Sequence, residues 1–111
     1  MIKDDDLEAM LEPIRLEFIA SLPERYAHFD ALWLKVTDGT ASQDDLTELR
    51  RGLHTLTGCG LTFGVPAISE AARPMEHHLD PICQAHRLPD AAEQAEFVSL
   101  MQALRAVDAA L

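Results

Sequence analysis

Apolar residues recur every three or four positions along most of this chain, which is the spacing of an amphipathic α-helix. The clearest stripe consists of Leu46, Leu49, Leu53, Leu56, Gly60 and Phe63. Further stripes run through residues 10–36 and 97–107, and residues 65–87 are helical in composition. No segment shows the strict alternation of a β-strand, so the pattern predicts helices joined by short loops.

Capping and turn residues divide these stripes into separate helices. Ser42 with Asp45, and Asp90 with Glu93, have the spacing of N-terminal capping boxes. Gly64 is suited to end the helix that starts near Ser42. The remaining signals are a turn at Asp38-Gly39 and a helix start at Pro66.

Prolines suggest two further boundaries. Ser21 and Glu24 have capping-box spacing with Pro23 in the first turn, which predicts a break or kink near Ser21 and a short extra helix before it. Pro74 and Pro81 each remove a backbone hydrogen bond and bend an interior helix. We therefore expect the helix that contains them to be bent or to restart at Pro81.

Together these elements predict an all-α protein: an antiparallel four-helix bundle with a short extra N-terminal helix. The 111 residues are expected to form one domain, residues 1–111. Hydrophobic residues make up 48% of the chain, so a core can form without a metal or a disulfide. Trp33 and Tyr26 are expected in that core. Cys59 and Cys83 are expected to be small buried apolar residues in a reducing compartment.

The formal net charge of −10 narrows the range of partners. It argues against a nucleic-acid binder, which needs clustered Lys and Arg, and against an anionic membrane surface. The acidic start of the chain does not resemble a signal peptide, and no apolar run approaches the roughly 20 residues of a membrane span. We therefore expect a soluble cytoplasmic protein whose partners are proteins or small molecules.

One stretch, LHTLTGCGLTFG, departs from ordinary helix composition. Glycine costs about 1 kcal/mol in a helix interior, yet Gly58 and Gly60 follow His54 within two turns. A helix position without a side chain lets another surface approach the backbone closely. Gly58 is therefore expected to give a partner access to His54.

The residues around His54 form an unusual helix face. On a helical wheel His54 lies roughly 120° from the centre of the apolar stripe, on the exposed flank. Arg50 and Gly58 lie one turn before and one turn after it on the same face, and Arg51 and Leu61 border that face. Two arginines beside an exposed histidine are a local exception in so acidic a chain.

These residues resemble the active-site signature of histidine-containing phosphotransfer (HPt) domains. That signature is usually His-x-Leu-Lys-Gly, then small residues, a hydrophobic residue and glycine. The matching positions are His54, Leu56, Gly58, Phe63 and Gly64. The resemblance extends over roughly residues 11–105: FIASLPERYAHFDAL is similar to the family's second helix, and ISEAARPME to the helix after the active-site helix.

The resemblance implies that His54 accepts a phosphoryl group from the aspartate of a receiver domain and passes it on in a two-component phosphorelay. The implied partners are a response regulator receiver domain, a hybrid sensor histidine kinase, or both. Such transfer depends mainly on positioning and electrostatics, which the receiver and its Mg²⁺ would supply. The chain would then need no cofactor and would be a phosphocarrier rather than an enzyme. The expected phosphate-proximal or docking residues are Thr57, Gly58, Arg50, Arg51 and Leu61.

One position departs from the family's pattern. The usual lysine, three residues after the histidine, is Thr57 here, and a threonine supplies no charge. Three readings stay open: Arg50 or Arg51 compensates, transfer is slower, or the chain is a non-phosphorylated helical module that binds a receiver or another protein.

The other histidines and exposed apolar residues have simpler interpretations. His77, His78, Cys83 and His86 invite a zinc site, but neighbouring helix positions diverge by about 100°; we expect a polar helix face and no metal. His28 is expected at the surface. Leu61 and Val65 are expected either to be exposed around His54 for docking or to cover the end of the bundle.

Overall fold

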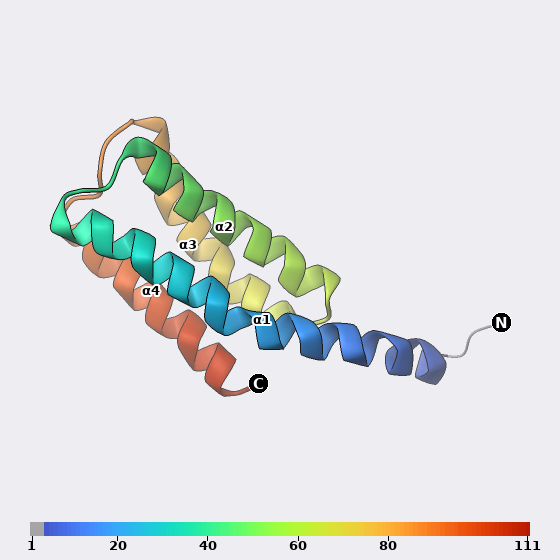
Figure 1. Cartoon of the computed structure of the whole chain (residues 1–111). Helices are drawn as coiled ribbons and strands as arrows, with labels where there is room; N and C mark the ends of the chain where they lie inside the picture. The colour runs from blue at the N-terminus through green and yellow to red at the C-terminus, as the bar shows by residue number, and fades with distance from the viewer. Residues whose placement is uncertain (1–3) are drawn as a thin grey trace.

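Four antiparallel helices make up the fold. The computed structural model describes residues 4–111. It contains α1 (Asp4–Asp38), α2 (Gln43–Thr62), α3 (Pro66–Gln84) and α4 (Ala91–Ala109), and consecutive helices run in opposite directions (Figure 1). No strand occurs in residues 4–111. The predicted all-α bundle is confirmed; the single domain stays a prediction, and residues 1–3 of it lie outside the described part.

The apolar stripes form the core. On α2 the predicted stripe is buried from Leu46 to Gly60, and Phe63 packs partly buried against the core. Trp33 and Tyr26 are both buried, as predicted, and Trp33 stacks on Phe97 with 4.1 Å between ring centroids. The core therefore fixes which face of α2 points outward, and that face carries His54.

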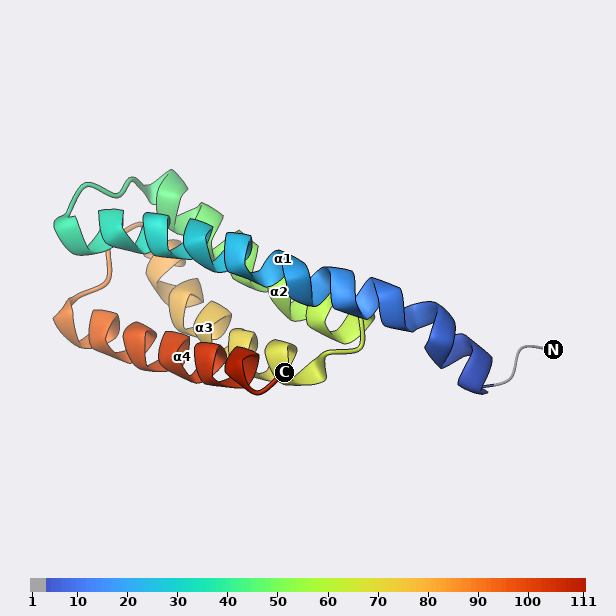
Figure 2. The same ribbon diagram turned by 60° about the horizontal axis from the view of Figure 1, so that its bottom comes forward.

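The predicted break near Ser21 is wrong. Helix α1 continues through it for 35 residues, and no separate N-terminal helix exists in the described part of the chain. The Ser21 hydroxyl donates to the carbonyl of Phe18 within the helix (2.6 Å) instead of capping a new one. Leu22 and Tyr26 are buried on either side of Pro23, so packing holds the helix together where one backbone bond is missing. The first part of α1 projects beyond the bundle (Figure 2).

The predicted restart at Pro81 is also wrong, because α3 is one helix from Pro66 to Gln84 with both prolines inside it. Pro74 and Pro81 are exposed. The carbonyls that each leaves without a helical partner therefore lie toward solvent, where water can bind them.

The other predicted boundaries are confirmed. Ser42 and Asp90 each form a capping box with the residue three positions on. Gly64 has a positive φ of 79° just after α2 ends, and Pro66 is the first residue of α3. None of the helices described combines the length and apolar character needed to cross a membrane.

Candidate functional site

His54 projects into solvent from the middle of α2. Its side chain is 72% exposed, while its neighbours Leu53 and Leu56 are fully buried in the core. The helix period thus anchors α2 on both sides of the histidine and turns the imidazole outward. The predicted exposure of His54 is confirmed.

Glu76 on α3 holds the imidazole from one side. His54 Nδ1 and Glu76 Oε1 are 2.6 Å apart, and Glu76 is only 9% exposed. An ionised carboxylate only accepts hydrogen bonds, so the contact with ionised Glu76 favours the tautomer in which Nδ1 carries the proton and donates it. The other ring nitrogen, Nε2, then keeps its lone pair. The arrangement orients the ring and leaves the Nε2 lone pair facing away from Glu76.

Sequence reasoning missed Glu76. The two residues are 22 positions apart, and only the alignment of α2 against α3 brings them together. A signal existed: a buried carboxylate needs a partner, and Glu76 lies within the apolar pattern of α3, between the buried residues Met75 and Leu79.

The two predicted arginines lie on different sides of α2. Arg50 reaches α3, where its Nη1 is 3.4 Å from Asp80 Oδ1. Arg51 is exposed and lines a groove toward α1, together with Arg25 and His28. Arg50 therefore shares the His54 face, and Arg51 does not.

Two of the three glycines of α2, Gly58 and Gly60, have different surroundings. A Cβ atom at Gly58 would have no neighbour within 4 Å. A Cβ atom at Gly60 would overlap the Ser69 hydroxyl and lie 2.9 Å from the Ser69 backbone nitrogen and 3.1 Å from the Val65 carbonyl oxygen. Gly60 permits close packing of α2 on α3, whereas Gly58 leaves open space one turn beyond His54.

Thr57 faces the interior rather than the His54 face. It is 8% exposed, and its hydroxyl donates to the Leu53 carbonyl (2.9 Å), while its own carbonyl accepts from the Ser69 hydroxyl. Its role near a phosphoryl group stays a prediction, but the side chain as it stands points into the helix–helix contact.

The two docking candidates at the end of α2, Leu61 and Val65, differ in exposure. Leu61 is 56% exposed. Val65 is only 3% exposed, so of the two expected alternatives it covers the end of the bundle instead of facing a partner. The reason is local: the Val65 N–H donates to the Gly60 carbonyl (2.7 Å) as the chain turns from α2 into α3, which carries the side chain inward.

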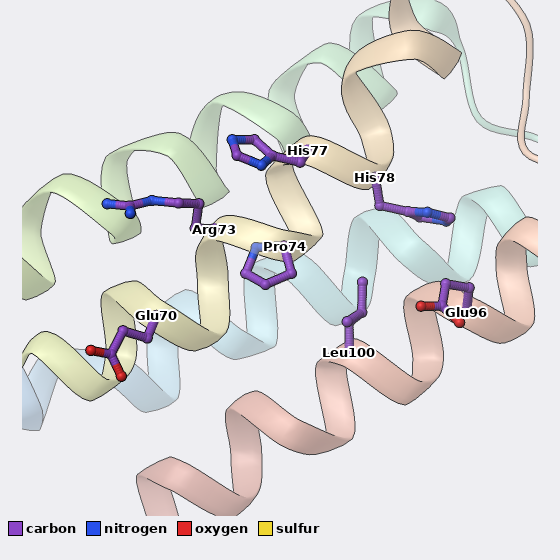
Figure 3. A pocket seen from close by; sticks show the side chains of 7 residues that line it. All are labelled: Glu70, Arg73, Pro74, His77, His78, Glu96 and Leu100. Carbon is purple, nitrogen blue, oxygen red and sulfur yellow. The ribbon is translucent and has the colours of Figure 1, made fainter.

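The remaining histidines and cysteines do not gather. Residues 4–111 contain no cluster of three potential metal ligands. His77 is exposed, and His78 Nε2 contacts the Glu93 carbonyl on α4 (2.8 Å), so the two rings diverge beside a shallow groove between α3 and α4 (Figure 3). Cys59 and Cys83 are free and only partly buried, and burial raises the pKa of the Cys83 thiol. His28 lies at the surface near Glu48, as predicted.

The family relationship follows from comparison with known proteins. The sequence model described as "Hpt domain" matches residues 13–110, which is nearly the whole chain. Comparisons with curated proteins and with solved structures found no match. Hpt domains are phosphocarrier modules of phosphorelays, in which they interact with kinases and receiver domains. The helical bundle, the exposed histidine on its second helix and this match together place the chain in the Hpt domain family.

Proposed function

We propose that this protein is a phosphorelay intermediate that accepts and donates a phosphoryl group on His54. The observation that carries the proposal is the pairing of an exposed imidazole with a buried carboxylate, His54 Nδ1 with Glu76 Oε1. Membership of the Hpt domain family supports phosphotransfer in general, and this contact supports Nε2 as the acceptor atom. We place the relay in the cytoplasm.

The chemistry needs little from this chain. The Nε2 lone pair attacks the phosphorus of an aspartyl phosphate, an N–P bond forms, and the P–O bond to the aspartate breaks. The aspartate leaves with the electron pair as a carboxylate. The ring keeps its Nδ1 proton and gains a positive charge, which the Glu76 carboxylate compensates. The reverse step passes the group on. The partner receiver would supply the Mg²⁺, so this chain is a carrier rather than an enzyme.

The partner would dock over the exposed face that runs from His54 to the end of α2. Leu61 follows His54 by two turns, roughly 10 Å along the helix. It borders a groove formed with the first part of α1, where Leu11 and Ile14 are also exposed. Exposed apolar side chains beside a polar reactive group suit a protein partner. Gly58, between His54 and Leu61, leaves the path open.

A labelling experiment tests the proposal. The purified protein is incubated with a radiolabelled phosphorylated receiver domain, and acid-labile label on the protein is measured. We expect His54→Gln to fold and to accept no label. The matched control His28→Gln changes another exposed histidine and should accept label as the unchanged protein does. Undiminished labelling of His54→Gln would overturn the assignment.

The alternative function is an interaction module that binds a receiver without carrying phosphate. The observation in its favour is Thr57, which stands where the family usually has lysine. Under this alternative the unchanged protein would bind the receiver in the same experiment and would remain unlabelled.

A further inference from the structure

The contacts between α2 and α3 define how the two antiparallel helices are aligned. Arg50 contacts Asp80, and His54 contacts Glu76. One turn toward the C-terminal end of α2 therefore corresponds to one turn toward the N-terminal end of α3. A further three positions lead from His54 to Thr57 on α2 and from Glu76 to Arg73 on α3. Arg73 thus lies level with the position that usually holds the family's lysine.

Arg73 is available to an incoming anion. It is exposed, and within residues 4–111 it takes part in no ion pair or side-chain hydrogen bond. Arg73 lines the groove between α3 and α4 that Figure 3 shows, and in that view its guanidinium extends from α3 away from α4. The other two arginines that could supply a positive charge near His54 are less suitable. Arg50 is paired with Asp80, and Arg51 lies on the α1 side of α2.

The residues around Arg73 leave room for an anion between Arg73 and His54. Gly58 leaves open space on α2 next to the level of Arg73, so a group on His54 Nε2 would not be screened by a side chain there. Two carboxylates lie one turn from Arg73. Glu76 is buried and occupied by the imidazole. Glu70 is exposed in the groove that Arg73 also lines, and it forms no ion pair within residues 4–111. A guanidinium presents several N–H donors in a plane that matches phosphate oxygens.

We propose that Arg73 contacts the phosphoryl group bound at His54 Nε2 and supplies the positive charge that lysine supplies elsewhere in the family. The inference rests on His54 being the phosphoacceptor. The charge comes from the neighbouring helix because the side chain at position 57 is turned into the bundle. Arg73 would attract the phosphoryl donor and stabilise the negative charge on the oxygens during transfer.

A small-molecule donor tests Arg73 without a receiver. Phosphoramidate transfers its phosphoryl group as Nε2 bonds to phosphorus and the P–N bond breaks, with ammonia leaving with the electron pair. Phosphorus NMR follows phosphohistidine formation at His54. We expect Arg73→Gln to slow formation about fivefold, the effect of one charge at contact distance in water. Arg73→Lys should recover most of the rate.

Two controls separate a charge effect from a structural one. Arg51→Gln removes the same charge from an exposed site on the other side of α2 and should leave the rate unchanged. The difference between the unchanged protein and Arg73→Gln should shrink as ionic strength rises to about 1 M, because salt screens exposed charges. Equal rates for Arg73→Gln and the unchanged protein at low salt would overturn the inference.

The same experiment keeps the two proposals apart. If phosphoramidate labels His54 but the phosphorylated receiver does not, the relay function fails while the Arg73 comparison still decides the inference. If the receiver labels His54 and Arg73→Gln changes neither rate, the relay stands and the inference fails. If neither donor labels His54, both are wrong.

Discussion

Two glycines two positions apart on α2 are present for opposite reasons. Gly60 touches the backbone of the next helix, and any side chain there must push α3 away. Gly58 touches nothing, so it only weakens the helix. A residue that lowers stability without a packing reason is expected where function sets the requirement. That contrast supports an approach path to His54.

Alanine at each position tests this contrast. Gly58→Ala should raise the free energy of unfolding by up to about 1 kcal/mol, because alanine is the better helix former and meets no neighbour. Gly60→Ala should lower it by about 1–3 kcal/mol through overlap with Ser69. Urea unfolding of the two variants measures both values. A destabilised Gly58→Ala would mean that this glycine has a structural role after all.

Single residues also show where sequence reasoning reaches its limit. The exposure of His54 follows from the helix period alone, since its neighbours define the buried side. The contact with Glu76 depends on how two helices slide against each other, and no local pattern encodes that alignment. Thr57 is expected near the phosphoryl group because it stands where the family usually has lysine, yet it lies near enough to the apolar stripe to be buried.

Among the helices, the capping boxes at Ser42 and Asp90 and the helix start at Pro66 are predicted correctly. The helix starts expected at Ser21 and at Pro81 are not present. A capping box is a local arrangement of four residues, so its spacing in the sequence carries most of the information. A proline or serine inside a helix is tolerated when tertiary packing outweighs one lost hydrogen bond. Burial of Leu22 and Tyr26 has this effect in α1, and that burial becomes visible only once the bundle is assembled.

The capping box of α4 makes part of the stability depend on pH. Hydrogen bonds from Arg87, and then from the Asp90 backbone, lower the pKa of Glu93 from 4.5 to about 2. Because the pKa is lower in the folded than in the unfolded state, the stabilisation is complete above about pH 4.5. It is lost as the pH falls toward 2.

We therefore expect Glu93→Gln to weaken the dependence of the unfolding midpoint on pH between 4.5 and 2. Chemical denaturation across that range measures it. The control Glu96→Gln alters an exposed carboxylate on the same helix that makes no hydrogen bond or ion pair within the described residues. The unfolding midpoint of Glu96→Gln should depend on pH as that of the unchanged protein does. Identical curves for the Glu93 variant and the unchanged protein would show that the cap does not titrate in this way.

The whole molecule is elongated, 54 × 25 × 19 Å, because α1 projects well beyond the other helices (Figure 2). This projecting part carries an exposed apolar face, consisting of Leu7, Met10, Leu11 and Ile14. It meets the end of α2 at the groove beside Leu61. Leu61 and His54 lie on the same side of α2, so the His54 face continues into this groove.

That continuity leads to a prediction about docking. Leu61→Asp places a charge at the groove, and Gly58→Gln places a long side chain on the path to His54. Both side chains point into solvent or open space, so folding should be unaffected. Both variants should slow transfer from a phosphorylated receiver by about tenfold, the effect of one disrupted interface contact of about 1.4 kcal/mol.

The matched control is Leu34→Asp, since Leu34 is 64% exposed and lies near the other end of α1. It adds the same charge away from the groove and should transfer as the unchanged protein does. Phosphoramidate, which needs no docking surface, should label Leu61→Asp at the normal rate. Slow labelling of Leu61→Asp by phosphoramidate as well would indicate damage to the site itself. Normal transfer from the receiver to Leu61→Asp would mean that the partner binds elsewhere.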